Sequence, residues 1–352
     1  MVVGDNGSTD RSVEIARSLG ARVVHEPRRW YGMALQAAIK EARGQYCIMG
    51  DCDDSYDWSA IGPFIEKLRQ GYDLVMGTRL KGTILPGAMP PLHRFFGNPF
   101  LSMMTNVFFR TGCSDAYCGM RGFSKEAYDR LGLRSAGMEF AIEMIVKASN
   151  RNLRITEIPV TLHMDGRSGT PHLRTFRDGW RTLRLLIMYA PDYLYVIPGA
   201  LLFVLGALVQ AVLLRGPVVV HGVYVGVHWL AVGCLCTLLG FQILSLGAFT
   251  KAFAMNESFE MRGRIFSRFF EWFSLEIGIL AGAFLIWLGL MADLAMLTTW
   301  IARSMGELGS THAAFVATTV IALGVQVVFS SFFLGMLSIG ISETHGSDGP
   351  TA

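Results

Sequence analysis

The second half of the chain is dominated by four long apolar stretches, near residues 193–214, 228–250, 275–299 and 313–341. Each stretch exceeds the roughly 20 residues that a helix needs to cross a bilayer. Charged residues make up only 17% of the chain, and they are concentrated in its first half. The sequence therefore predicts a polar domain over 1–165 and four transmembrane helices within 192–341. The small, polar tail at 342–352 is predicted to be disordered.

The charge and the cysteines exclude two classes of protein. A net charge of +3 is too small to predict binding to nucleic acid, and no basic tract is interleaved with aromatic residues. The six cysteines include the pairs Cys47–Cys52 and Cys113–Cys118. Structural zinc sites favour tighter spacings and histidine partners, so reduced thiols are the better interpretation. Nothing in the composition predicts an oligomeric state.

Short apolar runs alternate with amphipathic stretches in the polar domain. Strands are predicted over residues 22–24, 46–49, 74–76 and 155–160. Helical spacing recurs over residues 11–19, 33–42 and 59–68. This alternation of strands and helices predicts an α/β sandwich with a mostly parallel sheet.

Residues 166–191 form a segment of a different kind, in which arginines recur at helical spacing beside an apolar stripe. The arginines are Arg174, Arg177, Arg181 and Arg184, and the stripe consists of Phe176, Trp180, Leu183 and Ile187. An ordinary surface helix can carry the same pattern. We favour a helix on an anionic membrane surface, because a hydrophobic span begins directly after Pro191.

The loops between the apolar stretches differ in charge, which predicts their orientation. The loop over 251–271 carries four basic residues: Lys251, Arg262, Arg264 and Arg268. The other two loops hold one arginine each, Arg215 and Arg303. The positive-inside rule therefore places the 251–271 loop, the N-terminal domain and the C-terminus in the cytoplasm. The chain is expected to be a multi-pass membrane protein, in the plasma membrane if it is bacterial.

The strongest chemical signal is the segment Gly50-Asp51-Cys52-Asp53-Asp54-Ser55-Tyr56, which follows an apolar run. Closely spaced carboxylates at the end of a strand can hold Mg²⁺ or Mn²⁺. Such an ion would bridge the two phosphates of a nucleotide-sugar and neutralise charge on the departing diphosphate. Asp51 and Asp53 are the candidate ligands. A solvated turn or a helix cap is the alternative interpretation.

A second polar segment, Asp5-Asn6-Gly7-Ser8-Thr9-Asp10, also follows a predicted strand and opens a helix. Ligands of α/β sheets bind beyond the carboxyl ends of the strands, so this segment is a candidate for nucleotide binding. Ser8, Thr9 or Asp10 can cap the helix as well, and both roles can coexist.

Six motifs in a fixed order carry a resemblance to a known family. They are DNGSTD from Asp5, GDCDDSYD from Gly50, GTRL from Gly77, DAYCGMRGF from Asp115, GMEFAIEM from Gly137 and GRSGTPHLR from Gly166. In this order they resemble polyprenyl-phosphate glycosyltransferases of family 2, such as the dolichol-phosphate mannose synthases. The resemblance implies a Rossmann-like GT-A domain, the fold of nucleotide-diphospho-sugar transferases, followed by an α-helical transmembrane domain.

The resemblance also implies roles for individual residues. Asp5 and Asn6 would bind the nucleotide, and Asp51 and Asp53 would bind the metal and the diphosphate, with Ser55 as a further metal ligand. The implied catalytic residues are Asp53, Arg79, Arg94, Arg121 and Arg167, with Arg79 also binding the donor. On the acceptor side the implied residues are Arg94, Arg121, Glu139, Arg167, Ser168 and Arg174. Arginine suits these positions because its planar fork binds phosphate oxygens bidentately, although each arginine can instead be structural.

Two glutamates of the fifth motif, Glu139 and Glu143, lie one helical turn apart and share a face. They can orient the sugar or pair with arginines. Neither is predicted to be a general base, because a lipid monophosphate has a second pKa of about 6 and is already largely dianionic at neutral pH.

The function implied is metal-dependent, inverting transfer of a hexose from a UDP- or GDP-sugar to a polyprenyl phosphate at the membrane. The alternative is a catalytically silent membrane protein that keeps a nucleotide-sugar-binding domain as a regulatory or interaction module. Members of the family have a further strand and helix before the DNGSTD strand, and here Asp5 is almost at the start. We therefore expect a start upstream or a fragment, with an interior strand position left open in the sheet.

Overall fold

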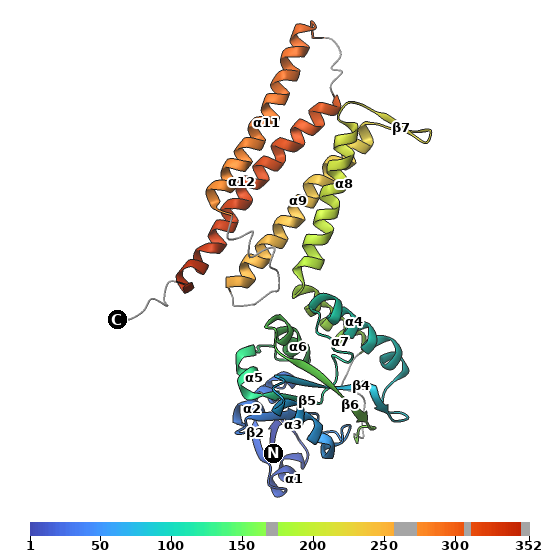
Figure 1. Cartoon of the computed structure of the whole chain (residues 1–352), viewed down its shortest axis with the longest axis vertical. Coiled ribbons are helices and arrows are strands. Elements are labelled where there is room, and N and C mark those ends of the chain that lie inside the picture. The colour runs from blue at the N-terminus through green and yellow to red at the C-terminus, as the bar shows by residue number, and fades with distance from the viewer. Residues whose placement is uncertain (167–174, 257–272, 306–310, 346–352) are drawn as a thin grey trace, which may run out of the picture. The chain divides into compact units, whose positions relative to one another are not determined.

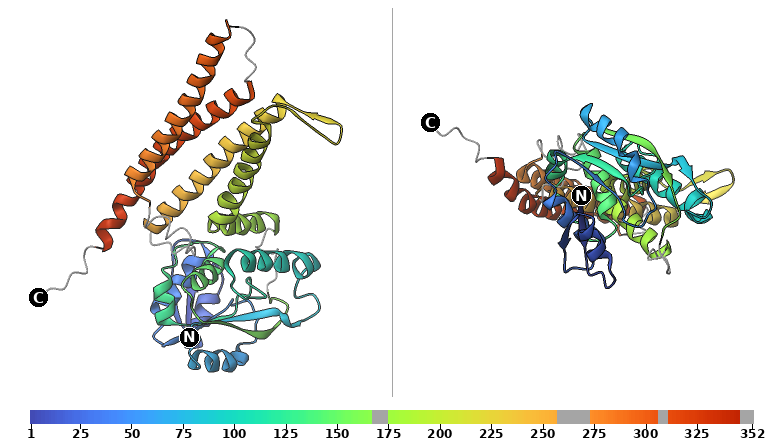
Figure 2. Two further views of the ribbon diagram at one scale, coloured as in Figure 1. Left: turned by 45° about the horizontal axis from the view of Figure 1, so that its top comes forward. Right: turned by 90° about the horizontal axis from the view of Figure 1, so that it is seen from below.

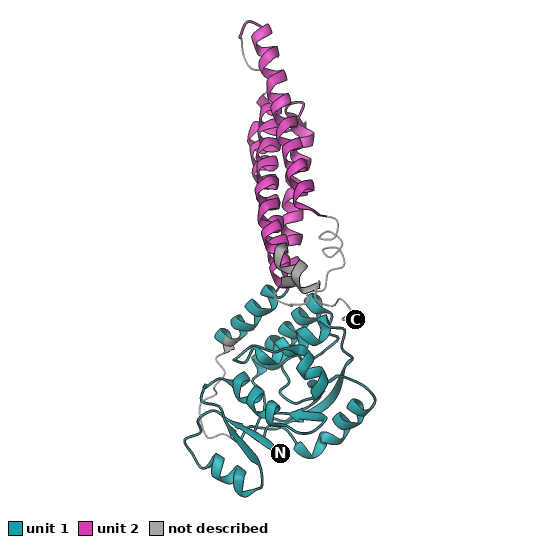
Figure 3. Cartoon of the chain, turned by 90° about the vertical axis from the view of Figure 1, so that its left-hand side faces the viewer, with its two compact units in different colours: residues 1–189 teal, residues 190–352 magenta. Residues whose placement is uncertain are grey.

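The fold is described from a computed structural model, which describes residues 1–166, 175–256, 273–305 and 311–345. The chain divides into two compact units, Met1–Tyr189 and Ala190–Ala352 (Figure 3).

The first unit alternates strands and helices, as the sequence predicts. Its strands are β1 (Val2–Asp5), β2 (Arg22–His25), β3 (Tyr46–Met49), β4 (Leu74–Ile84), β5 (Arg121–Ser124) and β6 (Ile155–Leu162). Its helices are α1 (Ser12–Ser18), α2 (Tyr31–Glu41), η1 (Trp58–Ile61), α3 (Gly62–Arg69), η2 (His93–Gly97), α4 (Asn98–Phe109), α5 (Lys125–Leu131), α6 (Phe140–Asn150) and α7 (Thr175–Met188). Every strand and helix predicted for the polar domain has a counterpart among these elements.

The expectation of a mostly parallel sheet is wrong for the larger sheet. Its strand order is β3-β5-β4-β6, and β5 runs antiparallel to both of its neighbours. Only β4 and β6 pair in parallel there. The sequence did not predict β5 because its four residues, Arg-Gly-Phe-Ser, are not an apolar run. Pairing with β3 on one side and β4 on the other makes this short segment a strand.

The remaining strands form a separate sheet in which β1 and β2 pair in parallel. Within the described ranges, β1 pairs only with β2, and β3 pairs only with β5. The β1–α1–β2 segment, dark blue in Figure 2, lies at one side of the unit.

The core of the first unit lies between α3 and the larger sheet. Phe64 and Leu68 of α3 pack with Val75 of β4 and with Met120, which precedes β5. Tyr56 belongs to the same cluster, so the loop after β3 is anchored in the core. Because apolar burial is the dominant stabilising contribution to folding, this packing gives the loop a defined position.

The described part of the second unit consists mainly of helices. They are η3 (Asp192–Val196), which continues into α8 (Ile197–Leu213), and α9 (Val227–Asn256), α11 (Leu275–Ala302) and α12 (Thr311–His345). A hairpin of β7 (Val218–Val220) and β8 (Val223–Val225), yellow in Figure 2, links α8 to α9.

Four helices of the described chain are long and apolar enough to cross a membrane. These candidate spans are Asp192–Leu213, Val227–Ala254, Leu275–Ala302 and Thr311–Leu337. They coincide with the four apolar stretches of the sequence.

Candidate active site

The loop after β3 carries the two candidate metal ligands. The Asp51 Oδ1 atom accepts a hydrogen bond of 3.1 Å from the Tyr31 hydroxyl. The Asp53 Oδ1 atom accepts one of 2.5 Å from the Ser55 hydroxyl and one of 3.2 Å from the Ser55 backbone N–H. Both carboxylates are therefore held by neighbouring donors. The Ser55 hydroxyl, predicted as a metal ligand, instead donates to Asp53 here.

Tyr31 is a site residue that sequence reasoning missed. It begins α2 and comes to Asp51 from 20 residues away. Burial, followed by the charge of Asp51, raises the pKa of Tyr31 above its ordinary value. The hydroxyl consequently stays protonated and remains a donor to the carboxylate. Its local sequence pattern carries no signal for this role.

The loop before β5 approaches the same carboxylate. A Cβ atom at Gly119 would lie 2.6 Å from the Asp51 Oδ2 atom, so only glycine leaves room for Asp51 in this position. The Gly119 N–H donates to the Tyr56 hydroxyl oxygen over 3.0 Å. The second and fourth sequence motifs, which lie far apart in the chain, therefore form one site.

Arg79 of the third motif joins this loop through a buried ion pair. Its Nε atom lies 2.8 Å from the Asp115 Oδ2 atom, and a second guanidinium nitrogen lies 2.9 Å from Oδ1. The Arg79 backbone N–H also donates to Asp115, over 3.0 Å. Burial disfavours the charged guanidinium, but the Asp115 carboxylate more than offsets this and raises the pKa of Arg79. Arg79 is thus a fixed cation, and Asp115 is a second residue that sequence reasoning missed.

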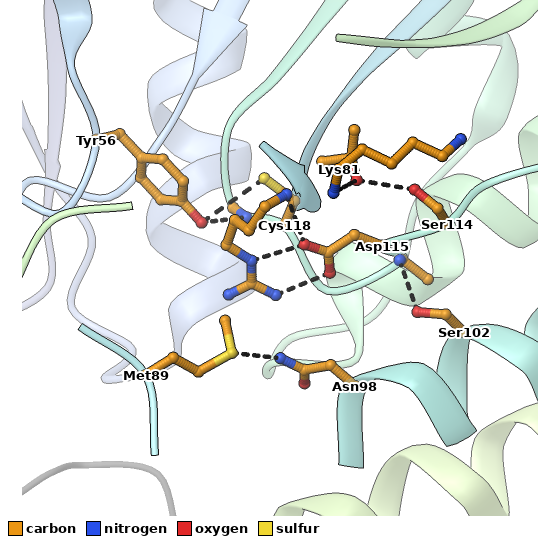
Figure 4. A network of polar contacts seen from close by, with 12 residues as sticks. Tyr56, Lys81, Met89, Asn98, Ser102, Ser114, Asp115 and Cys118 are labelled. Atoms are coloured by element: carbon orange, nitrogen blue, oxygen red, sulfur yellow. Dashed lines mark hydrogen bonds and ion pairs between the residues drawn. The ribbon is translucent and has the colours of Figure 1, made fainter. Parts of the chain in front are cut away.

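A network around Asp115 fixes the loop that carries it (Figure 4). The carboxylate of Glu157, on β6, accepts from the Ser114 backbone N–H over 2.5 Å and from the Ser114 hydroxyl. Lys81 pairs with Glu157 over 2.8 Å. The Ala116 N–H donates to the Ser102 hydroxyl oxygen over 3.1 Å. Segments from β4, α4 and β6 therefore all hold the 114–116 loop.

The sixth motif begins beside the carboxylates. The Gly166 N–H donates to the Asp53 carbonyl oxygen over 2.8 Å. Three predicted site residues of the following segment, Arg167, Ser168 and Arg174, lie outside the described residues.

Arg121, predicted to bind the acceptor phosphate, has a different role in the structure. Its side chain is fully buried. The guanidinium donates to the backbone carbonyls of Cys118 and Ala116, each over 2.9 Å, and to that of Ala141. It therefore links the loop before β5 to α6. In this structure its guanidinium is not exposed to an acceptor phosphate.

The nucleotide-binding candidates lie in the smaller sheet. Asp5 ends β1 and is buried, and its carboxylate accepts from the Ser8 N–H over 2.9 Å and lies 2.9 Å from the His25 Nδ1 atom. The hydrogen bonds from Ser8, followed by that from His25, lower the pKa of Asp5. Asn6 follows β1 and is partly exposed. The N-cap of α1 is Arg11, which makes no side-chain capping hydrogen bond, so the prediction that Ser8, Thr9 or Asp10 caps this helix is wrong. Asp10 accepts from the Ser12 N–H.

The other acceptor-side candidates are spread over two elements. Arg94 is exposed on η2, with its guanidinium 5.4 Å from the Phe95 ring centre. Glu139 lies at the N-terminus of α6 and is partly exposed. Its neighbour Glu143 is buried and accepts from the backbone N–H groups of Arg134 and Ser135, so Glu143 is structural.

The donor set of the loop fits a hard divalent cation that keeps open coordination positions. Among the described residues, no group of three or more His, Cys, Asp or Glu side chains is placed to hold a metal. Mg²⁺ is commonly bound by one or two carboxylates, with water and substrate phosphates completing its coordination. Asp51 and Asp53 match that requirement.

Comparison with known proteins identifies the family. Residues 1–132 match the description "Glycosyl transferase family 2", and residues 248–338 match the "Glycosyltransferase family 2 C-terminal transmembrane region". The chain is 41% identical over 342 residues to the low-salt glycan biosynthesis hexosyltransferase Agl6 of Haloferax volcanii. That alignment covers 96% of this chain and 81% of the relative.

Two further proteins are similar over about half of this chain. A dolichyl-phosphate hexose transferase of Haloferax volcanii is 31% identical over 180 residues, which cover 51% of this chain and 75% of the relative. The solved structure of glucosyl-3-phosphoglycerate synthase from Mycobacterium tuberculosis has a TM-score of 0.40 and 20% identity, over 53% of this chain and 66% of that one. The chain belongs to glycosyltransferase family 2, with a glycosyl transferase domain of that family and a C-terminal transmembrane region.

Proposed function

We propose that this glycosyltransferase moves a hexose from a nucleotide-diphospho-sugar onto a polyprenyl phosphate in the membrane. The observation that carries the proposal is the pair of carboxylates Asp51 and Asp53, each held by a hydrogen bond. Asp51 lies against Gly119, and the loop that contains Gly119 also contains Asp115, which pairs with Arg79. Two relatives support it by name, one a hexosyltransferase and the other a dolichyl-phosphate hexose transferase.

On the donor side, Asp51 and Asp53 would hold Mg²⁺ or Mn²⁺. The ion would supply charge neutralisation for the departing nucleoside diphosphate. Asp5 and Asn6, at the end of β1, are the candidates for the nucleoside. Arg79, kept charged by Asp115, adds a fixed positive charge that needs no reorganisation during the reaction.

On the acceptor side, the lipid phosphate is its own nucleophile. Its second pKa of about 6 leaves it largely dianionic at neutral pH. One phosphate oxygen forms the new bond to the anomeric carbon while the bond from that carbon to the diphosphate breaks. The electron pair leaves with the nucleoside diphosphate, and the sugar inverts. Since no proton has to be removed, the site needs cations rather than a general base.

The cations proposed for the acceptor are Arg94, Arg167 and Arg174, with Ser168 as a hydrogen-bond donor. Glu139 is proposed to orient the sugar through its hydroxyl groups. Arg121 is left out of this set because its guanidinium is already bonded to buried carbonyls. α7 is proposed to rest on the membrane surface, where its arginines would attract anionic headgroups.

The first unit is proposed to face the cytoplasm, where nucleotide-sugars are made available. The support is the uneven charge of the loops between the candidate spans. The segment between the second and third candidate spans carries Arg262, Arg264 and Arg268, whereas Arg215 and Arg303 are the sole Lys or Arg residues in the other two connections. Lys251, which the sequence assigns to this loop, lies within α9 instead.

The test is transfer of labelled hexoses from a panel of UDP- and GDP-sugars to polyprenyl phosphate by the full chain in membranes. We expect one donor to give a glycolipid that requires divalent metal and disappears with EDTA. Asp53→Asn should lower the rate at least about 100-fold, since it removes a ligand charge at the reacting centre.

The matched control is Asp57→Asn in the same loop. Asp57 is exposed, and its carboxylate accepts from the Ser59 N–H, a role that asparagine can also fill. This variant should keep nearly full activity. Transfer that is unaffected by both EDTA and Asp53→Asn would contradict the proposed site, and no transfer from any donor by the folded wild type would contradict the proposed function.

A further inference from the structure

The segment 29–31, which leads into α2, lies outside all six sequence motifs and contacts two of them at its ends. The Tyr31 hydroxyl donates to Asp51 of the second motif over 3.1 Å. The Arg29 guanidinium lies beside the first motif, since a Cβ atom added at Gly7 would be 3.2 Å from the Arg29 Nε atom. Under the proposed function, the first motif binds the nucleoside and the second binds the metal and the diphosphate. The segment therefore runs along the donor site.

Trp30, between these two residues, contacts the fifth motif. A Cβ atom added at Gly137 would be 3.8 Å from the Cε3 atom of the indole, and it would also contact the Glu139 Oε2 atom. The indole and the Glu139 carboxylate therefore both lie beside Gly137. Glu139 is the side chain proposed to orient the sugar, so Trp30 lies next to a candidate sugar-binding group.

The start of α2 is packed against the loop before α6, which fixes the backbone that carries Trp30. The Met33 N–H donates to the Ala136 carbonyl oxygen over 3.2 Å. A Cβ atom added at Gly32 would lie 2.8 Å from the same oxygen, so glycine allows this close approach. α2 also contacts α6 itself (Figure 1). The position of Trp30 is therefore set by contacts of its neighbours in the chain.

The indole of Trp30 is 52% exposed, although the backbone around it is fixed. A single exposed aromatic side chain is common on protein surfaces. Its surroundings distinguish this one, because ligand sites combine an aromatic surface with a few polar groups that orient the ligand. The polar groups here are Glu139 and the hydrogen-bonded pair Tyr31 and Asp51. The negative face of an aromatic ring attracts the C–H groups of a sugar, which carry partial positive charge.

We propose that Trp30 binds the hexose of the donor, with its indole packed against the C–H face of the sugar ring. This inference rests on the proposed function, in which Asp51 and Asp53 hold the metal on the diphosphate. The hexose is joined to the second phosphate, so it must lie within a few bonds of that metal. Packing against Trp30 would limit the orientations of the anomeric carbon, which favours attack by the acceptor phosphate.

The contacts of the segment favour the hexose over the nucleobase as the group that Trp30 binds. The candidates for the nucleoside, Asp5 and Asn6, directly precede Gly7 in the chain. Arg29 contacts that glycine, whereas Trp30 contacts the loop of the fifth motif.

The first test compares a nucleotide-sugar with the same nucleotide lacking the sugar. The full chain in detergent, with Mn²⁺, is titrated in a calorimeter with UDP-glucose and UDP, and with GDP-mannose and GDP. For the nucleotide-sugar that the wild type binds more tightly, Trp30→Ala should weaken binding about tenfold and change binding of the matching sugar-free nucleotide less than about twofold. Trp30→Phe should restore most of the lost affinity, because a phenyl ring also offers an aromatic face.

Ile15→Ala on α1 is the matched control, because Ile15 is 50% exposed and Trp30 is 52% exposed. It should leave both affinities unchanged, and thermal unfolding of each variant checks the fold. Equal losses of affinity for the nucleotide-sugar and the sugar-free nucleotide in Trp30→Ala would overturn the proposal. Unchanged affinity for both ligands in this variant would overturn it as well.

A second measurement needs only the conservative variant. The full chain is labelled with fluorotryptophan, and the fluorine resonance of Trp30 is identified by its absence from Trp30→Phe. This resonance should shift when the nucleotide-sugar is added and stay in place when the sugar-free nucleotide is added. A resonance that both ligands shift equally, or that neither shifts, would overturn the proposal. The sequence contains seven tryptophans, so the other six serve as internal controls.

The kinetics separate this inference from the proposed function. In transfer assays, Trp30→Ala should raise the KM for the donor about tenfold and leave the KM for polyprenyl phosphate unchanged. A wild type that binds a nucleotide-sugar but transfers nothing to polyprenyl phosphate would contradict the proposed function. The calorimetric and fluorine measurements would still decide the role of Trp30, because neither requires an acceptor.

Discussion

Three arginines of the first unit look alike in the sequence and have three different surroundings in the structure. Arg121 is fully buried against backbone carbonyls, Arg79 is paired with Asp115, and Arg94 is exposed beside Phe95. A guanidinium that already satisfies three buried carbonyls would leave them unpaired if it moved, which costs about 1–3 kcal/mol for each group. Residue type therefore predicted cationic chemistry, and burial decided which cation is available for it.

Gly119 gives the sharpest prediction at this scale. A Cβ atom there would lie 2.6 Å from the Asp51 Oδ2 atom, so Gly119→Ala should displace the carboxylate. We expect kcat/KM for transfer to fall about tenfold or more, equivalent to about 1.4 kcal/mol of transition-state stabilisation. The apparent affinity for Mn²⁺ should weaken in parallel.

Gly62→Ala is the control for that substitution, because a Cβ atom at Gly62 meets nothing within 4 Å. It should leave transfer and metal affinity unchanged. Unaltered kinetics in the Gly119→Ala variant would show that Asp51 is not constrained by this contact.

At the scale of elements, contacts with neighbouring elements determine features that the local sequence pattern does not predict. β5 is a strand because β3 and β4 flank it, although its four residues are not an apolar run. α4 buries Ser102 as well as Phe109 for a related reason, since the Ser102 hydroxyl accepts a hydrogen bond from the backbone of the adjoining loop. In the second unit, glycines allow close approach of helices, as expected where no hydrophobic force drives helices together inside a bilayer.

Gly282 of α11 tests this packing. A Cβ atom there would lie 2.7 Å from the Gly324 carbonyl oxygen of α12. Relief of this clash would require the backbone of one helix to move, because the contacted atom does not belong to a flexible side chain. Gly282→Ala should destabilise the second unit by about 1–3 kcal/mol through overpacking. The midpoint of thermal unfolding of the full chain in detergent measures the effect.

The same substitution at Gly335 of α12 is the control, because its added Cβ would be 3.6 Å from Leu275, an ordinary contact distance. A similar loss of stability in both variants would mean that the close crossing of α11 and α12 does not set their packing.

At the scale of the whole molecule, hydropathy divides the chain into the units that the structure resolves. The first unit ends at Tyr189, and the first candidate span begins at Asp192. The hairpin β7–β8 connects the first two candidate spans, so it must lie on the opposite side of the membrane from the first unit if both spans cross. Loop charge alone then predicts which side is the cytoplasm.

This orientation predicts the labelling pattern of two thiols with a membrane-impermeant maleimide. Cys52 is exposed in the first unit and should react only after intact cells are permeabilised. Tyr224→Cys, at an exposed position of β8, should react in intact cells. Permeabilised cells, in which both should react, provide the control. Reaction of Cys52 alone in intact cells would invert the proposed topology.

By itself the sequence determined the α/β domain, the four candidate spans, the acidic loop after β3 and the family. These features are local, because hydrophobic periodicity, the length of apolar stretches and short motifs depend only on residues that are close in the sequence. The Asp51–Asp53 loop was predictable because a strand that ends in carboxylates is visible in the order of residues alone.

Only the tertiary structure decided which distant residues complete the site. Tyr31 reaches Asp51 across 20 residues, and Asp115 reaches Arg79 across 36. The antiparallel β5 and the buried Arg121 were likewise decided by neighbours from other parts of the chain. Burial and hydrogen-bond partners depend on segments that meet only after folding. The periodicity of one segment therefore does not predict which residues of other segments it will contact.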